Sequence, residues 1–230
     1  MKAMILAAGL GTRMRPLTLH TPKPLLQVGG KALIVWHLER LAASGITQVV
    51  INHAWLGEQL EAELGNGQSW GLDICYSAET EPLETGGGIL KALPQLITES
   101  DDRFLVINAD VFCDLDLRLL IDTPLAEQDL GVLLMVDNPK WHEQGDFKLD
   151  SSGYLHPENG RSHTFSGISV LKGHLFESCQ SGRFPLAPLF RQAIASGCLR
   201  GVYHGGCWSD VGTPERLYQL DRQLIEEIKE

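Results

Sequence analysis

The chain has 230 residues, of which 43% are apolar and 21% charged, and its formal net charge at pH 7 is -10. This length suffices for one α/β domain with a sizeable core. The acidic balance disfavours a nucleic-acid binder, which needs clustered Lys and Arg, and no apolar run reaches the roughly 18–20 residues that span a bilayer.

The start of the chain does not have the pattern of a signal peptide. Residues 1–9 carry one lysine and a short apolar run that continues directly into Gly-Thr-Arg, whereas a secretory signal has a longer apolar region and a small-residue cleavage site. We therefore expect a cytoplasmic protein. The five cysteines form no CxxC pair and the histidines no HxxxH pattern, so we expect reduced thiols and no zinc site.

Apolar runs of strand length alternate with helical patterns in the first half of the chain. The expected strands are 3–8, 48–54, 72–78, 103–109 and 130–136, and the expected helices are 31–44, 57–64 and 86–93. Each helical pattern has apolar residues at a period near 3.6, and each strand is a short apolar or alternating run. This β-α-β-α order predicts a Rossmann-like doubly wound α/β fold with a mostly parallel sheet.

After Pro139 the sequence changes to short strands separated by turn residues. We expect these strands at 146–150, 154–156 and 164–171. They predict a small antiparallel lobe, spanning about 139–186, inserted at the carboxyl-terminal edge of the sheet. The chain contains no internal repeats or Ser/Gly linkers, so we interpret 1–230 as a single domain with a lobe.

The last part of the chain returns to the α/β pattern. We expect a helix at 187–196 and a final strand at 202–211. Thr213 is a suitable N-cap and Pro214 a suitable first helical residue. A final amphipathic helix is expected to run to about Ile228.

The most informative stretch is LAAGLGTRMRPLTLHTPKP at 6–24. It follows the first expected strand, and ligands of doubly wound folds bind beyond the carboxyl ends of the strands. Gly9 and Gly11 let backbone N–H groups approach a phosphate. Arg13 can form a forked contact with phosphate oxygens, and Lys23 lies between two prolines that hold its backbone extended. The stretch therefore predicts a triphosphate site with contacts from two sides.

Two common nucleotide-binding motifs are absent. Met14 stands where a dinucleotide fingerprint needs its third glycine, and the GxxxxGK[ST] pattern of a P-loop is missing. These departures disfavour a nicotinamide-dependent oxidoreductase.

The stretch resembles the signature of the sugar-1-phosphate nucleotidylyltransferases, L-A-A-G-x-G-T-R-[ML]-x-P-L-T followed by P-K-P-[ML]. The similarity continues over essentially the whole chain, in EPLETGGGI at 81–89, NAD at 108–110, FSGISVL at 165–171 and WSDVGTPERL at 208–217. The resemblance implies the nucleotide-diphospho-sugar transferase fold. It also implies transfer of a nucleotidyl group from a nucleoside triphosphate to a sugar 1-phosphate, with release of pyrophosphate.

Four catalytic residues follow from this resemblance. Asp110 and Asp210 each end an expected strand, and the resemblance implies that they bind a catalytic Mg²⁺, a hard cation that prefers oxygen ligands. Arg13 is expected to hold the β- and γ-phosphates. Lys23 is expected to bridge the α-phosphate and the sugar phosphate. No general base is needed, because the attacking phosphate is already ionised.

The resemblance also implies a set of nucleotide contacts. Besides Arg13 and Lys23, it comprises Leu6, Ala7, Ala8, Gly9, Gly11, Thr12, Ala78, Glu79, Glu84, Gly86 and Asn108. A glutamate that accepts a hydrogen bond from uracil N3–H is sensible chemistry, and Glu79 and Glu84 are both candidates for this role.

The sugar is expected to bind under the lobe. The implied contacts are Gly145, Asp146, Glu158, Phe165, Ser166 and Gly167. UTP and N-acetylmuramate 1-phosphate are the expected substrates, and the enzyme is expected to be a monomer or small homo-oligomer. The lactyl ether of muramic acid adds a carboxylate, for which Arg161, His163 and Lys148 are available cations.

Two alternatives stay open. The first is the same reaction with other substrates, giving GDP-mannose, dTDP-glucose, UDP-glucose or CDP-choline, because EPLETGGG is similar to the EPLGTAG of guanylyl enzymes. The second is a non-catalytic nucleotide-sugar sensor. That alternative predicts loss of catalytic residues, and Arg13, Lys23, Asp110 and Asp210 are all present.

Overall fold

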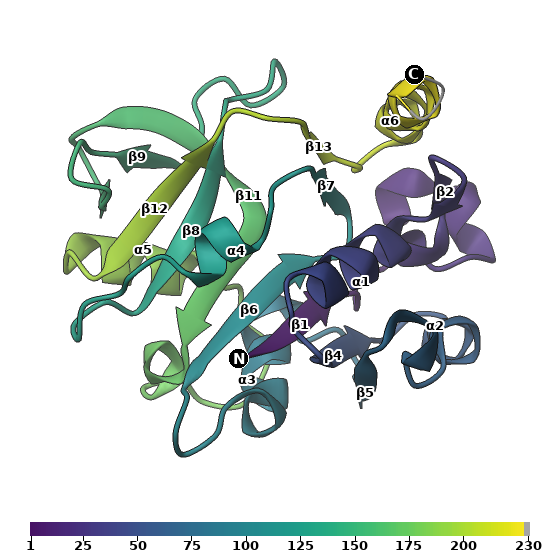
Figure 1. Cartoon of the computed structure of the whole chain (residues 1–230), viewed down its shortest axis with the longest axis horizontal. Helices are drawn as coiled ribbons and strands as arrows, with labels where there is room; N and C mark the ends of the chain where they lie inside the picture. Colours follow the sequence, from purple (N-terminus) through teal and green to yellow (C-terminus); the bar gives the residue numbers. More distant parts are fainter. Residues whose placement is uncertain (228–230) are drawn as a thin grey trace.

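The computed structural model describes residues 1–227, and a nine-stranded sheet forms its centre (Figure 1). Four neighbouring strands are parallel, in the order β6 (Arg103–Asn108), β1 (Lys2–Leu6), β4 (Gln48–His53) and β5 (Asp73–Ala78). Their carboxyl-terminal ends therefore lie at one edge of the sheet, where loops from different parts of the sequence meet.

The other half of the sheet is mixed. Its strands are β8 (Gly131–Val136), β9 (Phe147–Leu149), β10 (Leu155–His156), β11 (Arg161–Lys172) and β12 (Leu199–His204). The long strand β11 is antiparallel to β6 on one side and to β8 on the other, and β12 is parallel to β8. The first residues of β11 also pair with β9, so one strand links the sheet to the small β9–β10 extension.

Helices cover both faces of the sheet. On one face, α1 (Leu33–Ala43), α2 (Gly57–Leu64) and α4 (Arg118–Ile121) bury apolar side chains; on the other face, α3 (Glu84–Leu96) and α5 (Ala187–Ala195) do so. Burial of these apolar side chains is the main stabilising contribution, at roughly 25 cal/mol per Å² removed from water. The expected doubly wound α/β fold is therefore confirmed.

A third apolar cluster lies beside the sheet, under α6 (Pro214–Glu227). Leu217, Leu220 and Leu224 of this helix pack with Met14 and Phe112. The hairpin of β2 (Gln27–Val28) and β3 (Lys31–Ala32) is part of the same region, and the Gly29 N–H donates to Asp221 Oδ1 of α6 at 2.8 Å. Figure 1 shows α6 lying close to β2, far along the sequence from it.

Most expected elements are confirmed within a few residues. The helix expected at 57–64 has those bounds in α2, and 187–196 corresponds to α5. The predicted N-cap is also confirmed, because the Arg216 N–H donates to Thr213 Oγ1 at 3.4 Å. The expected end of the last helix, near Ile228, lies outside the described residues.

Two expectations were wrong. The run 164–171 is not a lobe strand but part of β11, which pairs with β6 and β8 inside the main sheet. The single strand expected at 202–211 is two strands, since Gly205 and Gly206 separate β12 from β13 (Trp208–Asp210). Strand β13 pairs with β7 (Val111–Cys113), a three-residue strand that periodicity does not reveal. In residues 1–227, no helix is long and apolar enough to cross a membrane.

A buried histidine lies on α1 beside β7. Burial and the nearby Arg40 lower the pKa of His37 to about 4, against the opposing effect of a hydrogen bond with the Val111 backbone. Its Nε2 has no hydrogen-bond partner among the described residues. Between about pH 4 and pH 6.5, this imidazole is therefore mostly neutral in the folded chain and mostly protonated in an unfolded chain.

This histidine predicts a fall in stability in acid. Its contribution is fully present above its unfolded pKa of about 6.5 and is lost as the pH falls toward about 4, by about 3 kcal/mol. In His37→Leu, the difference in unfolding free energy between neutral pH and pH 4, measured by urea titration with a chelator present, should shrink by that amount. The exposed His20→Asn should leave the difference unchanged, and an unchanged difference in His37→Leu would contradict the assignment.

Candidate active site

Two neighbouring cavities open at the carboxyl-terminal ends of β1 and β6. The first, of about 310 Å³, is lined by the predicted contacts Leu6, Ala7, Ala8, Gly9, Lys23, Glu84, Asn108 and Asp110. The second, of about 420 Å³, is lined by Arg13, Asn108, Asp110, Asp146, Phe165, Ser166, Gly167 and Asp210. Asn108 and Asp110 line both cavities, so a ligand extending from one cavity into the other would pass beside them.

The two candidate metal-binding carboxylates are brought together by the pairing of β7 with β13. In this antiparallel pair Asp210 lies opposite Val111, and the Val211 N–H donates to the Asp110 carbonyl at 2.9 Å. Residues 100 positions apart in the sequence thereby become neighbours across two short strands. Both side chains line the second cavity.

Each carboxylate is held by a cation through one oxygen. Lys23 Nζ lies 2.5 Å from Asp110 Oδ2, and Arg216 contacts Asp210 Oδ2 at 2.8 Å. Among residues 1–227, neither Oδ1 accepts a hydrogen bond. Two half-exposed carboxylates with a free oxygen each form a hard oxygen donor set, which fits Mg²⁺.

The loop after β1 presents unpaired backbone donors. From Ala8 to Arg13, no backbone N–H donates to another group of the described chain. Gly11 has a left-handed φ of 60°, and a Cβ there would lie 2.9 Å from Thr18 Cγ2. The turn leads into a 3-10 turn at Thr12–Met14. A run of free N–H groups in such a turn favours an anion.

Arg13 lies beyond this turn, on the side of the carboxylates. It lines the second cavity with Asp110 and Asp210, and it does not line the first cavity with Ala8 and Gly9. The structure therefore brings together all four expected catalytic residues, since Lys23 and Asp110 are in direct contact.

A buried polar network joins the loop after β1 to the loop after β5. Asn52 Oδ1 accepts the Ala7 N–H at 2.9 Å, and Asn52 Nδ2 donates to Glu79 Oε1 at 2.7 Å. The other oxygen, Glu79 Oε2, accepts the Leu83 N–H at 2.8 Å. Both oxygens of this buried carboxylate are thus occupied within the protein. Glu79 positions two loops and does not face the cavity.

Glu84 is the candidate base-reading glutamate that lines the first cavity. It begins α3 with a left-handed φ of 59°, a rare conformation for a residue with a side chain. Its Oε1 contacts Arg183 Nε at 2.9 Å. The sequence did not separate Glu79 from Glu84, but in the structure only Glu84 lines the first cavity.

Seven expected contact residues line neither cavity: Gly11, Thr12, Ala78, Glu79, Gly86, Gly145 and Glu158. Gly86 donates its N–H to the Phe184 carbonyl at 3.0 Å, and a Cβ there would lie 2.4 Å from the Phe184 ring. Its role is close packing of α3 against that segment. The Ala78 carbonyl accepts from Lys91 Nζ. Glu158 is highly exposed, with its carboxylate 3.7 Å from Lys148 Nζ.

A bulge in β11 shapes the second cavity. The register between β11 and β8 shifts between Phe165 and Ser169, which leaves Ser166 and Gly167 outside the regular ladder. Bulges of this kind commonly redirect residues beside binding sites. Asp146 fixes the start of the bulge, since its Oδ2 accepts the Phe165 N–H at 2.8 Å.

The three cations considered for a sugar carboxylate lie elsewhere. Arg161 pairs with Asp137 on the surface, Lys148 donates to the Glu158 carbonyl, and His163 is buried beside the Tyr203 ring. None of them lines the second cavity. Its lining contains Arg13 and, unanticipated, His142, whose Nε2 lies 3.0 Å from Asp146 Oδ1.

Three further residues of the site, Asn52, Trp141 and Arg216, were not expected from the sequence. Asn52 lies in the INHAWLG stretch at the end of β4, a position that the β-α-β-α pattern places at the ligand edge. Arg216 lies inside the WSDVGTPERL stretch at 208–217, and its guanidinium lies over the Trp141 ring at 4.7 Å. Its partner Asp210 is only six positions earlier in the sequence, and the residues between them form the start of α6.

Residues 2–227 match the nucleotidyl transferase family. The chain belongs to that family. This nucleotidyl transferase is 47% identical over 223 residues to the N-acetylmuramate alpha-1-phosphate uridylyltransferase of Neisseria meningitidis serogroup B, covering 94% of this chain and 95% of the relative. It is 32% identical to the protein of the same name from Caulobacter vibrioides, over 97% of each chain.

A solved structure supports the fold of this nucleotidyl transferase. HddC from Yersinia pseudotuberculosis, complexed with GMP-PN, superposes with a TM-score of 0.79 at 23% identity, covering 96% of this chain and 98% of that chain. The expected nucleotide-diphospho-sugar transferase fold is therefore confirmed.

The buried network predicts that Glu79 is needed for stability. Glu79→Gln replaces one acceptor oxygen by an amide that can only donate, so either Asn52 or the Leu83 N–H loses its partner. We expect a loss of about 1–3 kcal/mol in unfolding free energy, measured by urea titration. Glu81→Gln, on the exposed part of the same loop, is the matched control, and equal stability of the two variants would show that the network contributes nothing.

Proposed function

We propose that the protein joins UTP to N-acetylmuramate 1-phosphate, releasing pyrophosphate and forming UDP-N-acetylmuramate in the recycling of peptidoglycan sugars. The observation that carries the proposal is the pair of cavities that share Asn108 and Asp110. A nucleotide in the first cavity and a sugar phosphate in the second would meet at that boundary. The 47% identity to a protein of this name over nearly the whole chain supports the choice of substrates.

The chemistry is in-line substitution at the α-phosphate. A phosphate oxygen of the sugar 1-phosphate forms a bond to the α-phosphorus, and the bond from that phosphorus to the bridging oxygen breaks, so pyrophosphate leaves. Since nucleophile and target are both anionic, the task of the protein is alignment and charge neutralisation. Lys23 and Arg13 lie on the two sides of Asp110, where these charges meet. The free N–H groups of the loop after β1 would bind the leaving phosphates.

Asp110 and Asp210 would hold a Mg²⁺ ion. Bound there, the ion would supply positive charge that stabilises the phosphate oxygens of the transition state. Lys23 and Arg216 orient these carboxylates and balance their charge.

Glu84 would read the base in the first cavity. Uracil presents one N–H between two carbonyl oxygens, and a carboxylate accepts from that N–H. The Arg183 contact orients the Glu84 carboxylate. In the second cavity, Asp146, Ser166 and the exposed ring of Trp141 would contact the sugar.

Pyrophosphate release tests the reaction directly. The purified protein with Mg²⁺ is assayed with UTP, GTP, dTTP and CTP, each combined with the 1-phosphates of N-acetylmuramate, N-acetylglucosamine, glucose and mannose. We expect release with UTP and N-acetylmuramate 1-phosphate, abolished by EDTA. Preference for another pair would overturn the substrates, and absence of release with every pair would favour the sensor.

The carboxylate pair predicts a large effect of a conservative change. Asp110→Asn removes one charge from the boundary of the two cavities and should lower kcat by roughly a thousandfold or more at saturating Mg²⁺. Asp116→Asn, at an exposed site after β7, is the control for loss of an aspartate. A near-normal kcat in a folded Asp110→Asn protein would refute the proposed metal ligands.

His142 predicts discrimination between sugars. His142 lines the second cavity, and its Nε2 contacts Asp146 and none of the residues proposed to bind phosphate. We propose that it faces the lactyl carboxylate of the sugar. His142→Ala should raise KM for N-acetylmuramate 1-phosphate about tenfold, the equivalent of about 1.4 kcal/mol. KM for N-acetylglucosamine 1-phosphate should not change. Equal changes for both sugars would contradict this role, and Lys148→Ala should affect neither.

A further inference from the structure

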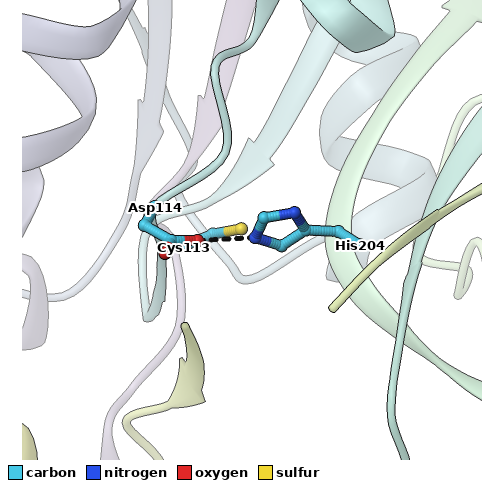
Figure 2. Close-up of side chains that lie close together, drawn as sticks. All are labelled: Cys113, Asp114 and His204. Atoms are coloured by element: carbon cyan, nitrogen blue, oxygen red, sulfur yellow. Dashed lines mark hydrogen bonds and ion pairs between the residues drawn. The ribbon is translucent and has the colours of Figure 1, made fainter. Parts of the chain in front are cut away.

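Three side chains with metal-binding atoms meet at the end of β7 that is farther from Asp110. Cys113 is the last residue of β7, Asp114 follows it, and His204 is the last residue of β12. A thiol sulfur, a carboxylate oxygen and an imidazole nitrogen all lie within 4.8 Å of one another. Figure 2 shows the Cys113 sulfur and the Asp114 carboxylate both directed at the His204 ring.

The positions of these atoms are set by the surrounding backbone. Asp114 Oδ1 contacts His204 Nε2 at 2.5 Å, while Asp114 Oδ2 accepts the Cys207 N–H at 3.0 Å. The Asp114 N–H in turn donates to the Cys207 carbonyl at 3.0 Å. Because the Cys207 backbone holds Oδ2 of this carboxylate, Oδ1 is oriented toward the imidazole of His204.

A glycine keeps the space around this contact open. A Cβ on Gly206 would lie 2.6 Å from Asp114 Oδ1 and 2.6 Å from both Cε1 and Nε2 of His204. These distances are shorter than any side chain tolerates, so another residue at this position would displace the carboxylate or the imidazole. The cluster is therefore a built arrangement, with ligands from two elements and a glycine between them.

The donor set differs from that of the carboxylate pair. A thiolate, an imidazole and a carboxylate together suit Zn²⁺, whereas Mg²⁺ takes oxygen ligands only. We propose that Cys113, Asp114 and His204 form a Zn²⁺ site separate from the catalytic centre. Asp114 is half exposed and His204 less so, which leaves the fourth coordination position open to water.

The geometry requires only small side-chain movements. Zinc bonds of about 2.0–2.3 Å place tetrahedral ligand atoms about 3.3–3.7 Å apart. The His204–Asp114 contact would open by about 1 Å, and the widest separation in the cluster would close by about as much. Zinc would displace the proton of the Cys113 thiol, whose pKa burial raises to about 11, and metal binding would therefore release a proton.

The zinc site would connect the β7–β13 pair to the main sheet. Strand β7 (Val111–Cys113) lies between Asp110 and Asp114, so the two metal sites lie about 10–13 Å apart along extended backbone. His204 belongs to β12, which pairs with β8 in the main sheet. Zinc would therefore join the β7–β13 pair, which carries Asp110 and Asp210, to the sheet at a second point. This role is structural, so its test does not depend on activity.

Cobalt(II) is a spectroscopic probe for this site. The full chain is freed of metal with a chelator, returned to buffer with excess Mg²⁺ to occupy the carboxylate pair, and titrated with Co²⁺. We expect a near-ultraviolet thiolate-to-cobalt charge-transfer band that saturates at one equivalent and disappears when Zn²⁺ is added. Absence of the band at one equivalent would overturn the proposal.

Variants identify the ligands. Cys113→Ser should abolish the band, and His204→Gln should raise the Kd for Co²⁺ at least tenfold. Cys75→Ser, at an exposed thiol outside the cluster, and Asp110→Asn should leave band and Kd unchanged. A band that survives Cys113→Ser, or that is lost in Asp110→Asn, would place the metal elsewhere and overturn the proposal. If Cys113→Ser does not fold, the unchanged Kd of a folded His204→Gln protein would do the same.

Discussion

The pairing of two three-residue strands, β7 and β13, is the constraint on which the site depends. It places Asp110 beside Asp210 through one ladder and the hydrogen bond from Val211 to the Asp110 carbonyl. Two like charges so close repel each other, and the contacts of Lys23 and Arg216 offset this repulsion. Strands this short do not form alone. Val111 and Cys113 of β7 pack in the apolar cluster that contains α1, and Phe112 packs with the leucines of α6.

The buried Asn52–Glu79 network performs the corresponding task for the first cavity. A buried carboxylate is costly unless its oxygens are paired, and here Asn52 and the Leu83 N–H satisfy both. Since Asn52 also fixes the Ala7 N–H, the loop after β1 is anchored at its start while its following N–H groups stay free. The anchoring positions these donors before a ligand arrives, which lowers the cost of ordering them on binding.

The sequence predicted most of the fold because its elements have strong local patterns, as in α2 and β6. It could not place β11, since an apolar run reads the same at the edge of a lobe and in the centre of a sheet. Strands β7 and β13 are too short for any periodicity. Glu79 and Glu84 looked alike as loop acids, and only burial and hydrogen bonds separate them. The sequence likewise does not show which way a side chain on a short strand or loop points. Residue type alone therefore could not separate His142, which lines the second cavity, from Arg161 and Lys148, which do not.

The position of α6 has a consequence for the stage of synthesis at which the active site can form. Strands β1, β4, β5 and β6 all lie in the first half of the chain, so they leave the ribosome before the later elements. Asp210, Arg216 and the leucines of α6 that pack with Met14 and Phe112 are translated much later. Because Met14 lies in the loop after β1, that loop would gain its apolar support at the same stage as the site gains its second carboxylate. Nucleotide binding and catalysis would therefore both depend on the packing of α6 against the start of the chain.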